Sequence, residues 1–199
     1  MSERKPLILA SQSNARQALL RSAQIPFEAI LADIDERAVQ VKSGLCDPGA
    51  IAGHLAREKA LHVARKQPGR IVIGADQTLA LGERLFSKPI DRAVAQEQLA
   101  ALSGRTHHLN SAVIVVRDGD ILFSHVAVAD MTMRALDSKT ISDYLDRAGD
   151  TVMQSVGGYQ LEGLGVHLFE RIEGDYFTIL GLPLLPLLTF LRGAKLIAL

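Results

Sequence analysis

A lysine stands where the sequence otherwise predicts a buried, apolar helix surface. The segment that starts at Asp47 and Pro48 has helical periodicity, and at roughly 100° per residue its apolar stripe runs through Ile51, Leu55, Ala52, Val63 and Ala56. Lys59 falls within that stripe. Because burying an unpaired ammonium is costly, Lys59 must snorkel to water, pair with a carboxylate, or face an anionic ligand in a cleft.

Arg16 is a second charged residue on an apolar helix face. It shares its predicted face with the residues at i+3, i+4 and i+7, so it points inward near the helix N-terminus. Backbone amides of the turn at 11–13, the helix dipole and the guanidinium would together bind a phosphate, with Ser13 as the helix cap. The spacing is not that of a P-loop, and an arginine in a strand-turn-helix segment is also common without such a site.

Asp76 follows directly on the most apolar strand that the sequence predicts, 71–75. Open α/β sheets place their ligands at the carboxyl ends of strands, so Asp76 is either a metal ligand or general base, or only a turn or cap residue. The acidic pair Asp35 and Glu36 follows another predicted strand, and Lys88 lies in a predicted loop. Ordinary solvated surface is the alternative explanation for these charges.

These residue types together suit the hydrolysis of a phosphoanhydride. Carboxylates hold Mg²⁺ and orient or deprotonate water, while arginine and lysine neutralise a polyphosphate. The glycine-rich segment 157–163 either lets the backbone approach a ligand or forms a plain turn. Composition and spacing therefore indicate a protein that acts on a phosphorylated small molecule, and they do not specify which one.

The charge balance disfavours nucleic acid and anionic membranes as partners. Lys plus Arg equals Asp plus Glu at 22 each, aromatic residues make up 5%, and no basic stripe is interleaved with aromatics. The apolar stretch 177–191 is broken by Gly181, Pro183 and Pro186, so it does not predict a membrane span. In 199 residues, a hydrophobic fraction of 48% is enough for a substantial core.

Cysteine usage and the N-terminal segment predict a cytoplasmic protein. The single cysteine, Cys46, allows no intrachain disulfide and offers no zinc-binding spacing, which fits a reducing compartment. No charged stretch followed by a cleavable apolar run precedes the strand that begins at Leu7, so no signal peptide is expected.

Strand and helix patterns alternate along the chain. Strands are predicted at 7–10, 27–31 and 71–75, around the turn at 82–83, on both sides of an Asp118-Gly119 turn between 106 and 135, and at 176–180. Helices are predicted at 14–23, 47–67, 91–102 and 137–148, and after Pro183. This alternation, with one hairpin, indicates an α/β protein with a mixed sheet.

Seven short motifs occur in order along the chain. They are LASQSNAR at 9–16, IDE at 34–36, REKA at 57–60, GADQT at 74–78 with KP at 88–89, SGRTH at 103–107, GGYQLEG at 157–163 and GLP at 181–183. Each is weak alone, but seven in order are highly specific. Over essentially the whole chain they resemble the Maf nucleotide pyrophosphatases, also called septum formation inhibitor-like proteins.

The resemblance implies one Maf-like domain over 1–199, with an elongated, two-lobed, ITPase-like α/β fold whose mixed sheet is flanked by helices and whose active site lies in the cleft between the lobes. It also implies an enzyme, often a homodimer, that hydrolyses nucleoside triphosphates to monophosphate and pyrophosphate with a divalent metal, Mg²⁺ or Mn²⁺. Such an enzyme would be a house-cleaning hydrolase of nucleotide metabolism.

Site residues carry over by position. Asp76 would be the catalytic proton acceptor, and Glu36 would help it to bind the metal. Lys59 would face the cleft as a further catalytic residue. The resemblance gives the triphosphate a set of partners: Ser11, Arg16, Lys59 and Lys88.

Two departures from the family pattern bear on the substrate. Asn14 and Ala15 stand where the family usually has Pro and then Arg or Trp, which removes one phosphate or base contact. Gln77 and Glu162 are the residues expected to bind the base, and they resemble the branch that acts on 7-methyl-GTP rather than the pyrimidine branch. A carboxylate accepts the N1 and N2 protons of guanine, whereas a glutamine also offers the donor that a pyrimidine O4 needs. With no Trp in the chain, stacking on a purine would need Phe, Tyr or Arg.

Two other functions compete with a purine-type pyrophosphatase. One is a pyrophosphatase that prefers dTTP or UTP, and the other is a nucleotide-sensing regulator of cell division with little turnover. The acidic pair and Asp76 favour an enzyme, because a sensor has no need to position water. His107 and His108 remain candidates for catalysis, although strand histidines beside a turn are more often structural.

Overall fold

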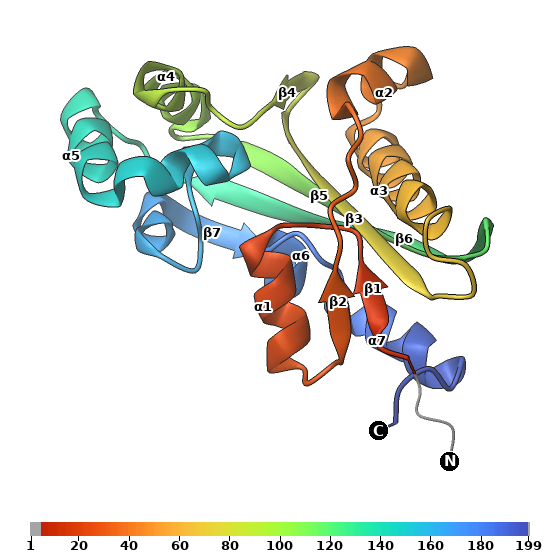
Figure 1. Ribbon diagram of the computed structural model, residues 1–199. Helices are drawn as coiled ribbons and strands as arrows, with labels where there is room; N and C mark the ends of the chain where they lie inside the picture. The colour runs from red at the N-terminus through yellow and green to blue at the C-terminus, as the bar shows by residue number, and fades with distance from the viewer. Residues whose placement is uncertain (1–4, 199) are drawn as a thin grey trace.

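The computed structural model describes residues 5–198, which are built around one mixed sheet (Figure 1). Its seven strands are β1 (Leu7–Leu9), β2 (Phe27–Ala29), β3 (Val72–Leu81), β4 (Arg84–Phe86), β5 (Thr106–Arg117), β6 (Asp120–Met133) and β7 (Phe169–Glu173). The order is β2-β1-β3-β5-β6-β7, and β4 pairs with the end of β3. Strand β1 is parallel to β2 and β3, and the other pairs are antiparallel, so the predicted mixed sheet is confirmed.

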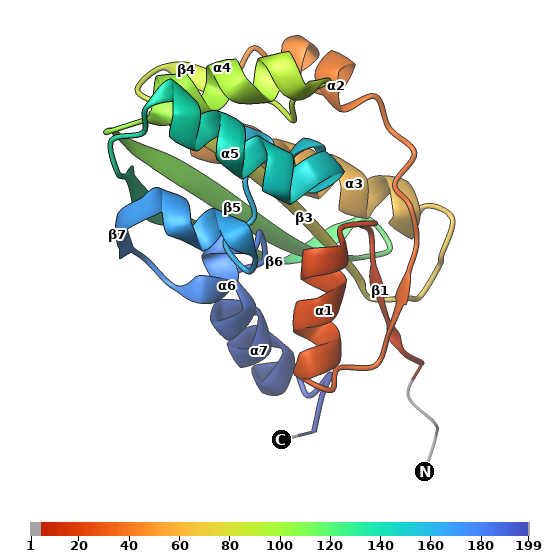
Figure 2. The same cartoon turned by 90° about the vertical axis from the view of Figure 1, so that its left-hand side faces the viewer.

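Helices lie on both faces of this sheet (Figures 1 and 2). The α-helices are α1 (Asn14–Ser22), α2 (Glu36–Ser43), α3 (Pro48–Ala64), α4 (Arg92–Leu102), α5 (Ser138–Ala148), α6 (Tyr176–Ile179) and α7 (Leu184–Gly193). The 3₁₀ helices η1 (Gly149–Gln154), η2 (Val156–Gly158) and η3 (Leu164–Leu168) follow α5. No helix within residues 5–198 is long and apolar enough to cross a membrane.

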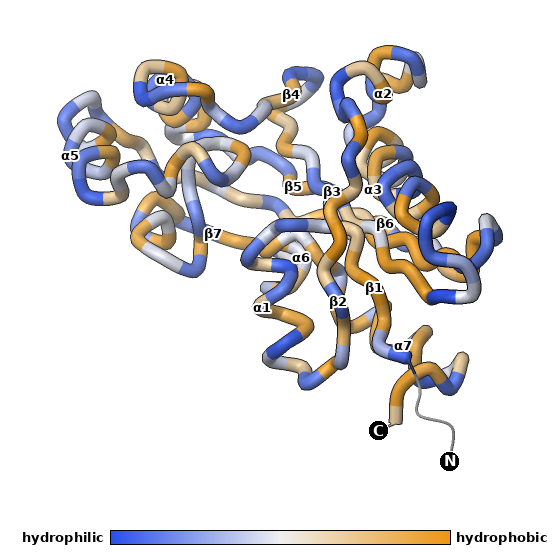
Figure 3. Tube along the Cα trace, in the orientation of Figure 1, coloured by the Kyte–Doolittle hydropathy of each residue, from blue (hydrophilic) through white to orange (hydrophobic). Residues whose placement is uncertain are grey.

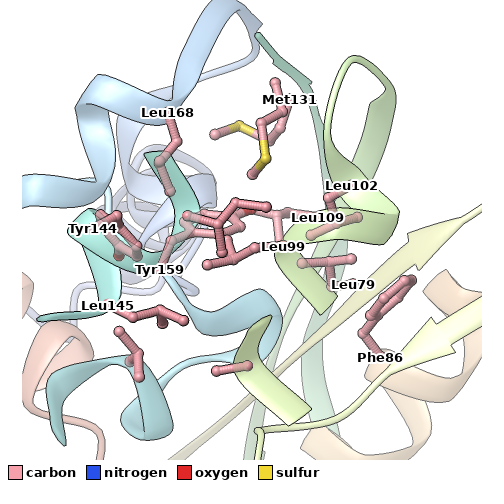
Figure 4. Packing of buried hydrophobic residues seen from close by; sticks show 14 of the residues in the cluster. Leu79, Phe86, Leu99, Leu102, Leu109, Met131, Tyr144, Leu145, Tyr159 and Leu168 are labelled. Carbon is pink, nitrogen blue, oxygen red and sulfur yellow. The ribbon is translucent and has the colours of Figure 1, made fainter. Parts of the chain in front are cut away.

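Three clusters of buried side chains hold the layers together. Helix α3 packs through its alanines on one face of the sheet, against β1, β3 and β5. On the other face, one cluster joins α1 and α7 to the first half of β3, up to Ala75. A second cluster there joins α4 and α5 to the second half of β3, from Leu79 (Figure 4). One sheet therefore carries two lobes, and residues 76–78 lie where they meet.

The hydropathy of the chain follows these layers (Figure 3). The central strands are mainly hydrophobic, whereas α2 has no buried side chain at all. This explains why the sequence did not predict α2, since a helix without a buried face has no apolar periodicity to detect.

Two predicted strands are corrected by the structure. The segment at 176–180 is not a strand: it contains the short helix α6, whose cap Asp175 accepts hydrogen bonds from the amides of Phe177 and Thr178. The strand at 71–75 is too short, because β3 continues through Asp76 to Leu81. Asp76 therefore lies inside a strand, not at its carboxyl end. The structure also adds β7, which pairs with β6 and was not predicted.

Candidate active site

The candidate site lies beside β3, where the sheet has a gap along one edge. Strand β1 pairs with β3 only as far as Ile73, and β4 pairs with it only from Leu79. The stretch between them, with Asp76 at its centre, therefore has no strand neighbour on that side within the described residues. A pocket of about 1150 Å³ opens at this gap and is lined by both lobes. Strand β1 ends at this gap, and Asp76 lies just past its carboxyl end on the neighbouring strand. In open α/β sheets the carboxyl ends of strands are where ligands bind.

Lys59 joins two carboxylates inside the pocket. Its Nζ lies 2.5 Å from Oδ1 of Asp76 and 2.8 Å from Oε1 of Glu36. The side chains of Lys59 and Asp76 are 10% and 8% exposed, whereas that of Glu36 is 54% exposed. The lysine on the apolar helix face is thus explained by pairing with carboxylates, and snorkelling to bulk water is not needed.

The environment of Asp76 increases its basicity. Burial raises the pKa of Asp76 above the ordinary carboxyl value; Lys59 and Arg16 oppose this shift, and the negative charge of Glu36 adds to it. A carboxylate with a raised pKa accepts a proton more readily at neutral pH, as a general base must. Asp76 therefore has the electrostatics that a proton acceptor requires.

Asp76 and Glu36 also suit a hard divalent cation. Both carboxylates contact one ammonium through a single oxygen each, so the two groups lie close together. Within residues 5–198 no group of three or more His, Cys, Asp or Glu side chains is placed to hold a metal. Mg²⁺ is commonly bound by one or two carboxylates together with substrate phosphates and water. A metal at this pair would need oxygens from the ligand.

Arg16 is engaged by the protein itself. Its Nε donates to the Gly181 carbonyl at 2.7 Å, and its Nη1 donates to the Ala75 carbonyl at 2.9 Å and to Ser11 Oγ at 3.3 Å. Because Ala75 lies in the stretch of β3 without a strand neighbour, the guanidinium occupies part of the gap. Burial lowers the pKa of Arg16, and the carboxylates of Asp76 and Glu36 counteract that shift. Arg16 thereby ties α1, β3 and the turn before α7 together.

Gln77 has a similar connecting role. Its Nε2 donates to Ser111 Oγ at 2.9 Å and to the carbonyls of Thr178 and Ile179 at 3.1 Å and 3.0 Å. Ser111 Oγ in turn donates to the Thr178 carbonyl at 2.7 Å. The amide donors of Gln77 therefore fasten β3 to α6, and Oε1 is the part of the side chain left for a ligand.

Asp35, the other member of the acidic pair, lies outside the pocket lining as the N-cap of α2. The lining contains the eight residues to which the resemblance gives a role: Ser11, Arg16, Glu36, Lys59, Asp76, Gln77, Lys88 and Glu162. Lys88 belongs to the loop after β4, and Glu162 to the glycine-rich segment. The structure brings them together, while their individual roles toward a ligand stay predictions.

The pocket also contains residues that sequence reasoning missed. Arg37 and Gln40 reach it from α2, and Phe86 and Tyr159 form part of its apolar wall. No signal for the first two was available in the sequence, because α2 has no buried face from which a helical periodicity could be read.

The two neighbouring histidines lie outside the pocket lining. His107 is fully buried, and its Nε2 lies 2.7 Å from the hydroxyl of Tyr159, which does line the pocket. His108 lies on the other face of β5 and pairs with Asp130 at 2.7 Å. His107 thus supports the pocket wall from behind.

Acid is expected to weaken the fold through His107. Burial lowers the pKa of His107 from 6.5 to about 4. Between these two pH values the His107 imidazole is protonated in the unfolded chain and neutral in the folded protein. The free energy of unfolding is therefore unaffected by this group above pH 6.5, and it falls by about 3 kcal/mol as the pH decreases from 6.5 toward 4. Urea unfolding from pH 7 to pH 4.5 should show a shallower loss of unfolding free energy for His107→Gln than for the unaltered protein. The exposed control His167→Gln should keep the original slope, and an unchanged slope in His107→Gln would contradict the assignment.

The fold and the site define an α/β protein with a charge-lined pocket at a break in its sheet. Comparison with known sequences then specifies the family: the chain belongs to the Maf family, whose model, described as "Maf-like protein", matches residues 6–194. The resemblance drawn from the seven motifs is confirmed.

The chain is similar in sequence to proteins that are named as pyrophosphatases. A "Nucleoside triphosphate pyrophosphatase" of Rhodopseudomonas palustris is 62% identical over 194 residues, covering 98% of this chain and 96% of the relative. A "7-methyl-GTP pyrophosphatase" of Brucella abortus is 54% identical over 192 residues, covering 95% and 96%. Among solved structures, a nucleoside-triphosphatase described as a dITP/XTP pyrophosphatase, from Mycobacterium abscessus, aligns with a TM-score of 0.43 and 16% identity over 96% of each chain.

Proposed function

We propose that this protein is a nucleoside triphosphate pyrophosphatase that releases a nucleoside monophosphate and pyrophosphate, with a modified purine nucleotide such as 7-methyl-GTP as its substrate. The observation that carries the proposal is the buried Lys59–Asp76 pair, extended to Glu36, at the break in the sheet. The names of the relatives supply the reaction class.

The phosphates fit the polar side of the pocket. Residues 11–15 line it at the start of α1, where backbone amides and the helix dipole favour an anion. Lys88 reaches the same pocket from the loop after β4. Arg16 keeps the start of α1 against β3, so it shapes this phosphate site while its own Nε and Nη1 are occupied.

The reaction breaks the bond between the α-phosphorus and the oxygen that bridges to the β-phosphate. Water attacks the α-phosphorus, Asp76 accepts a proton from that water, and pyrophosphate leaves with the bridging oxygen. Lys59 orients the Asp76 carboxylate through the contact between its Nζ and Oδ1. Asp76 and Glu36 would hold the divalent metal, which when bound neutralises phosphate charge and increases the electrophilicity of phosphorus.

The nucleoside fits the apolar side of the pocket. Phe86, Tyr159 and Leu161 provide apolar surface there, and Glu162 places a carboxylate in the same lining. Because the donors of Gln77 are occupied by the protein, its Oε1 and the Glu162 carboxylate both act as acceptors. Acceptors suit the N1 and N2 protons of guanine, and a carboxylate also favours the positive charge of a 7-methylated guanine.

A nucleotide panel tests this function and its need for metal. The purified protein is incubated with the standard triphosphates, 7-methyl-GTP, pseudo-UTP and 5-methyl-UTP, with Mg²⁺ or Mn²⁺ or with EDTA, and the products are separated by chromatography. We expect 7-methyl-GTP to give equal amounts of monophosphate and pyrophosphate, and EDTA to reduce the rate at least about 100-fold, since the metal carries much of the charge stabilisation.

Other outcomes have definite meanings. Turnover confined to UTP and dTTP would keep the reaction and overturn the assignment of the base. Release of orthophosphate would identify a different bond as the one cleaved. Nucleotide binding with no turnover would reject the enzyme and favour the alternative hypothesis of a nucleotide-sensing regulator of cell division.

A further inference from the structure

Four cationic side chains line the pocket: Arg16, Arg37, Lys59 and Lys88. They differ in how many hydrogen bonds and ion pairs they make to other residues of the protein. Because a polyphosphate needs cations that are free to bind it, their existing partners decide which of them are available.

Two of the four are committed to protein partners. Arg16 is buried and donates to two backbone carbonyls and to a serine hydroxyl. Lys59 is buried between Asp76 and Glu36. The single charge of Lys59 thus faces two carboxylates within the site, and the guanidinium of Arg16 is fixed in place.

The other two cations are exposed and face the pocket from separate elements. Arg37 comes from α2 and Lys88 from the loop after β4, and neither makes an ion pair or a side-chain hydrogen bond to any residue in 5–198. The uncharged side chains of Asn14 and Ala15 also line the pocket. Arg37 and Lys88 are therefore the cations of this site that are left for an anion.

Helix α2 directs Arg37 toward the pocket. Glu36, Arg37 and Gln40 lie within about 100° of one another around the helix axis, and all three line the pocket. Lys42, on the same helix, points away and is absent from the lining. Since none of the side chains of α2 is buried, little packing opposes a movement of this helix toward a bound anion.

We propose that Arg37 binds the β- and γ-phosphates of the substrate, which leave as pyrophosphate, together with Lys88. This rests on the proposed function, and it adds a binding residue that the sequence did not indicate. Glu36, which precedes Arg37, pairs with Lys59, and the proposed reaction puts the α-phosphate at Lys59 and Asp76. The proposed nucleoside position is beside residues 154–156 and 159–162, which also line the pocket. A guanidinium binds a phosphate through two parallel hydrogen bonds, which suits the doubly charged end of pyrophosphate.

The test compares Arg37→Gln with Lys42→Gln, which removes the same charge from the other side of the same helix. Calorimetric titration with inorganic pyrophosphate and Mg²⁺, and separately with the nucleoside monophosphate, measures the two halves of the substrate. For Arg37→Gln we expect pyrophosphate to bind about 10- to 100-fold more weakly, the range for one charge-assisted pair, and the monophosphate to bind within about 2-fold of the unaltered protein. Lys42→Gln should bind both as the unaltered protein does, and Arg37→Lys should recover part of the affinity.

Several results would overturn the assignment of Arg37. One is equal pyrophosphate affinity in Arg37→Gln and Lys42→Gln. Another is a loss of monophosphate affinity in Arg37→Gln as large as its loss of pyrophosphate affinity. A third is no pyrophosphate binding by the unaltered protein. A lower midpoint of thermal unfolding in Arg37→Gln alone would reveal a structural role. The experiment also distinguishes failure of this proposal from failure of the proposed function. If pyrophosphate binding depends on Arg37 but no nucleotide is hydrolysed, Arg37 is a polyphosphate ligand and the protein is not the proposed enzyme.

Discussion

Replacing Asp76 with asparagine is expected to lower kcat for nucleoside triphosphate hydrolysis by about 10²- to 10⁴-fold, the range for loss of a general base. Asparagine has nearly the same shape but accepts no proton at neutral pH. It also removes one of the two carboxylates available to a metal. Product formation under saturating substrate and metal measures the effect.

The structure indicates that the site stays folded in this variant. Lys59 keeps Glu36 as a partner at 2.8 Å, so the variant leaves no unpaired buried ammonium. The exposed Asp33 lies outside the pocket lining, so Asp33→Asn makes the same chemical change without touching the site. Full activity in Asp76→Asn, or an equal loss in Asp33→Asn, would reject Asp76 as the proton acceptor.

Replacing Gly74 with alanine is expected to produce the largest loss of stability, about 3 kcal/mol, at the upper end for overpacking a core. Helix α3 crosses β3 so closely here that a Cβ on Gly74 would overlap the carbonyl oxygen of Ala56 and lie 2.8 Å from the Cβ of Ala60. One of these neighbours is backbone, so the helix as a whole must move. Urea unfolding at neutral pH measures the free energy.

The same displacement should reach the site. Lys59 immediately precedes Ala60 on α3, while Asp76 is two residues beyond Gly74 on β3, so separating the two elements lengthens the contact between Lys59 and Asp76. Activity at a temperature where the variant is still folded should therefore fall as well. Gly53→Ala is the control on α3: its Cβ would meet only a Val126 methyl at 3.7 Å, and helix propensity predicts a gain of up to about 1 kcal/mol. An unchanged free energy of unfolding in Gly74→Ala would contradict the close contact between α3 and β3 at Gly74.

The sequence by itself identified the family and eight residues of the pocket lining. Charged residues such as Lys59 and Arg16 on otherwise apolar helix faces were detectable because local periodicity shows which side of a helix is buried. The mixed α/β class followed in the same way from alternating strand and helix patterns. These properties depend on neighbours within a few residues.

Tertiary structure decided which of those residues are free to act. Arg16 meets the carbonyl of Gly181, and Gln77 meets that of Thr178, across more than a hundred residues of chain, so no local spacing shows that their donors are occupied. Whether β3 has an open edge at Asp76 likewise depends on where β1 and β4 stop pairing. Arg37 was hidden for the opposite reason, since a helix without a buried face looks like solvated chain. Local periodicity reports burial, but hydrogen-bond partners distant in the sequence are set only when the elements pack together.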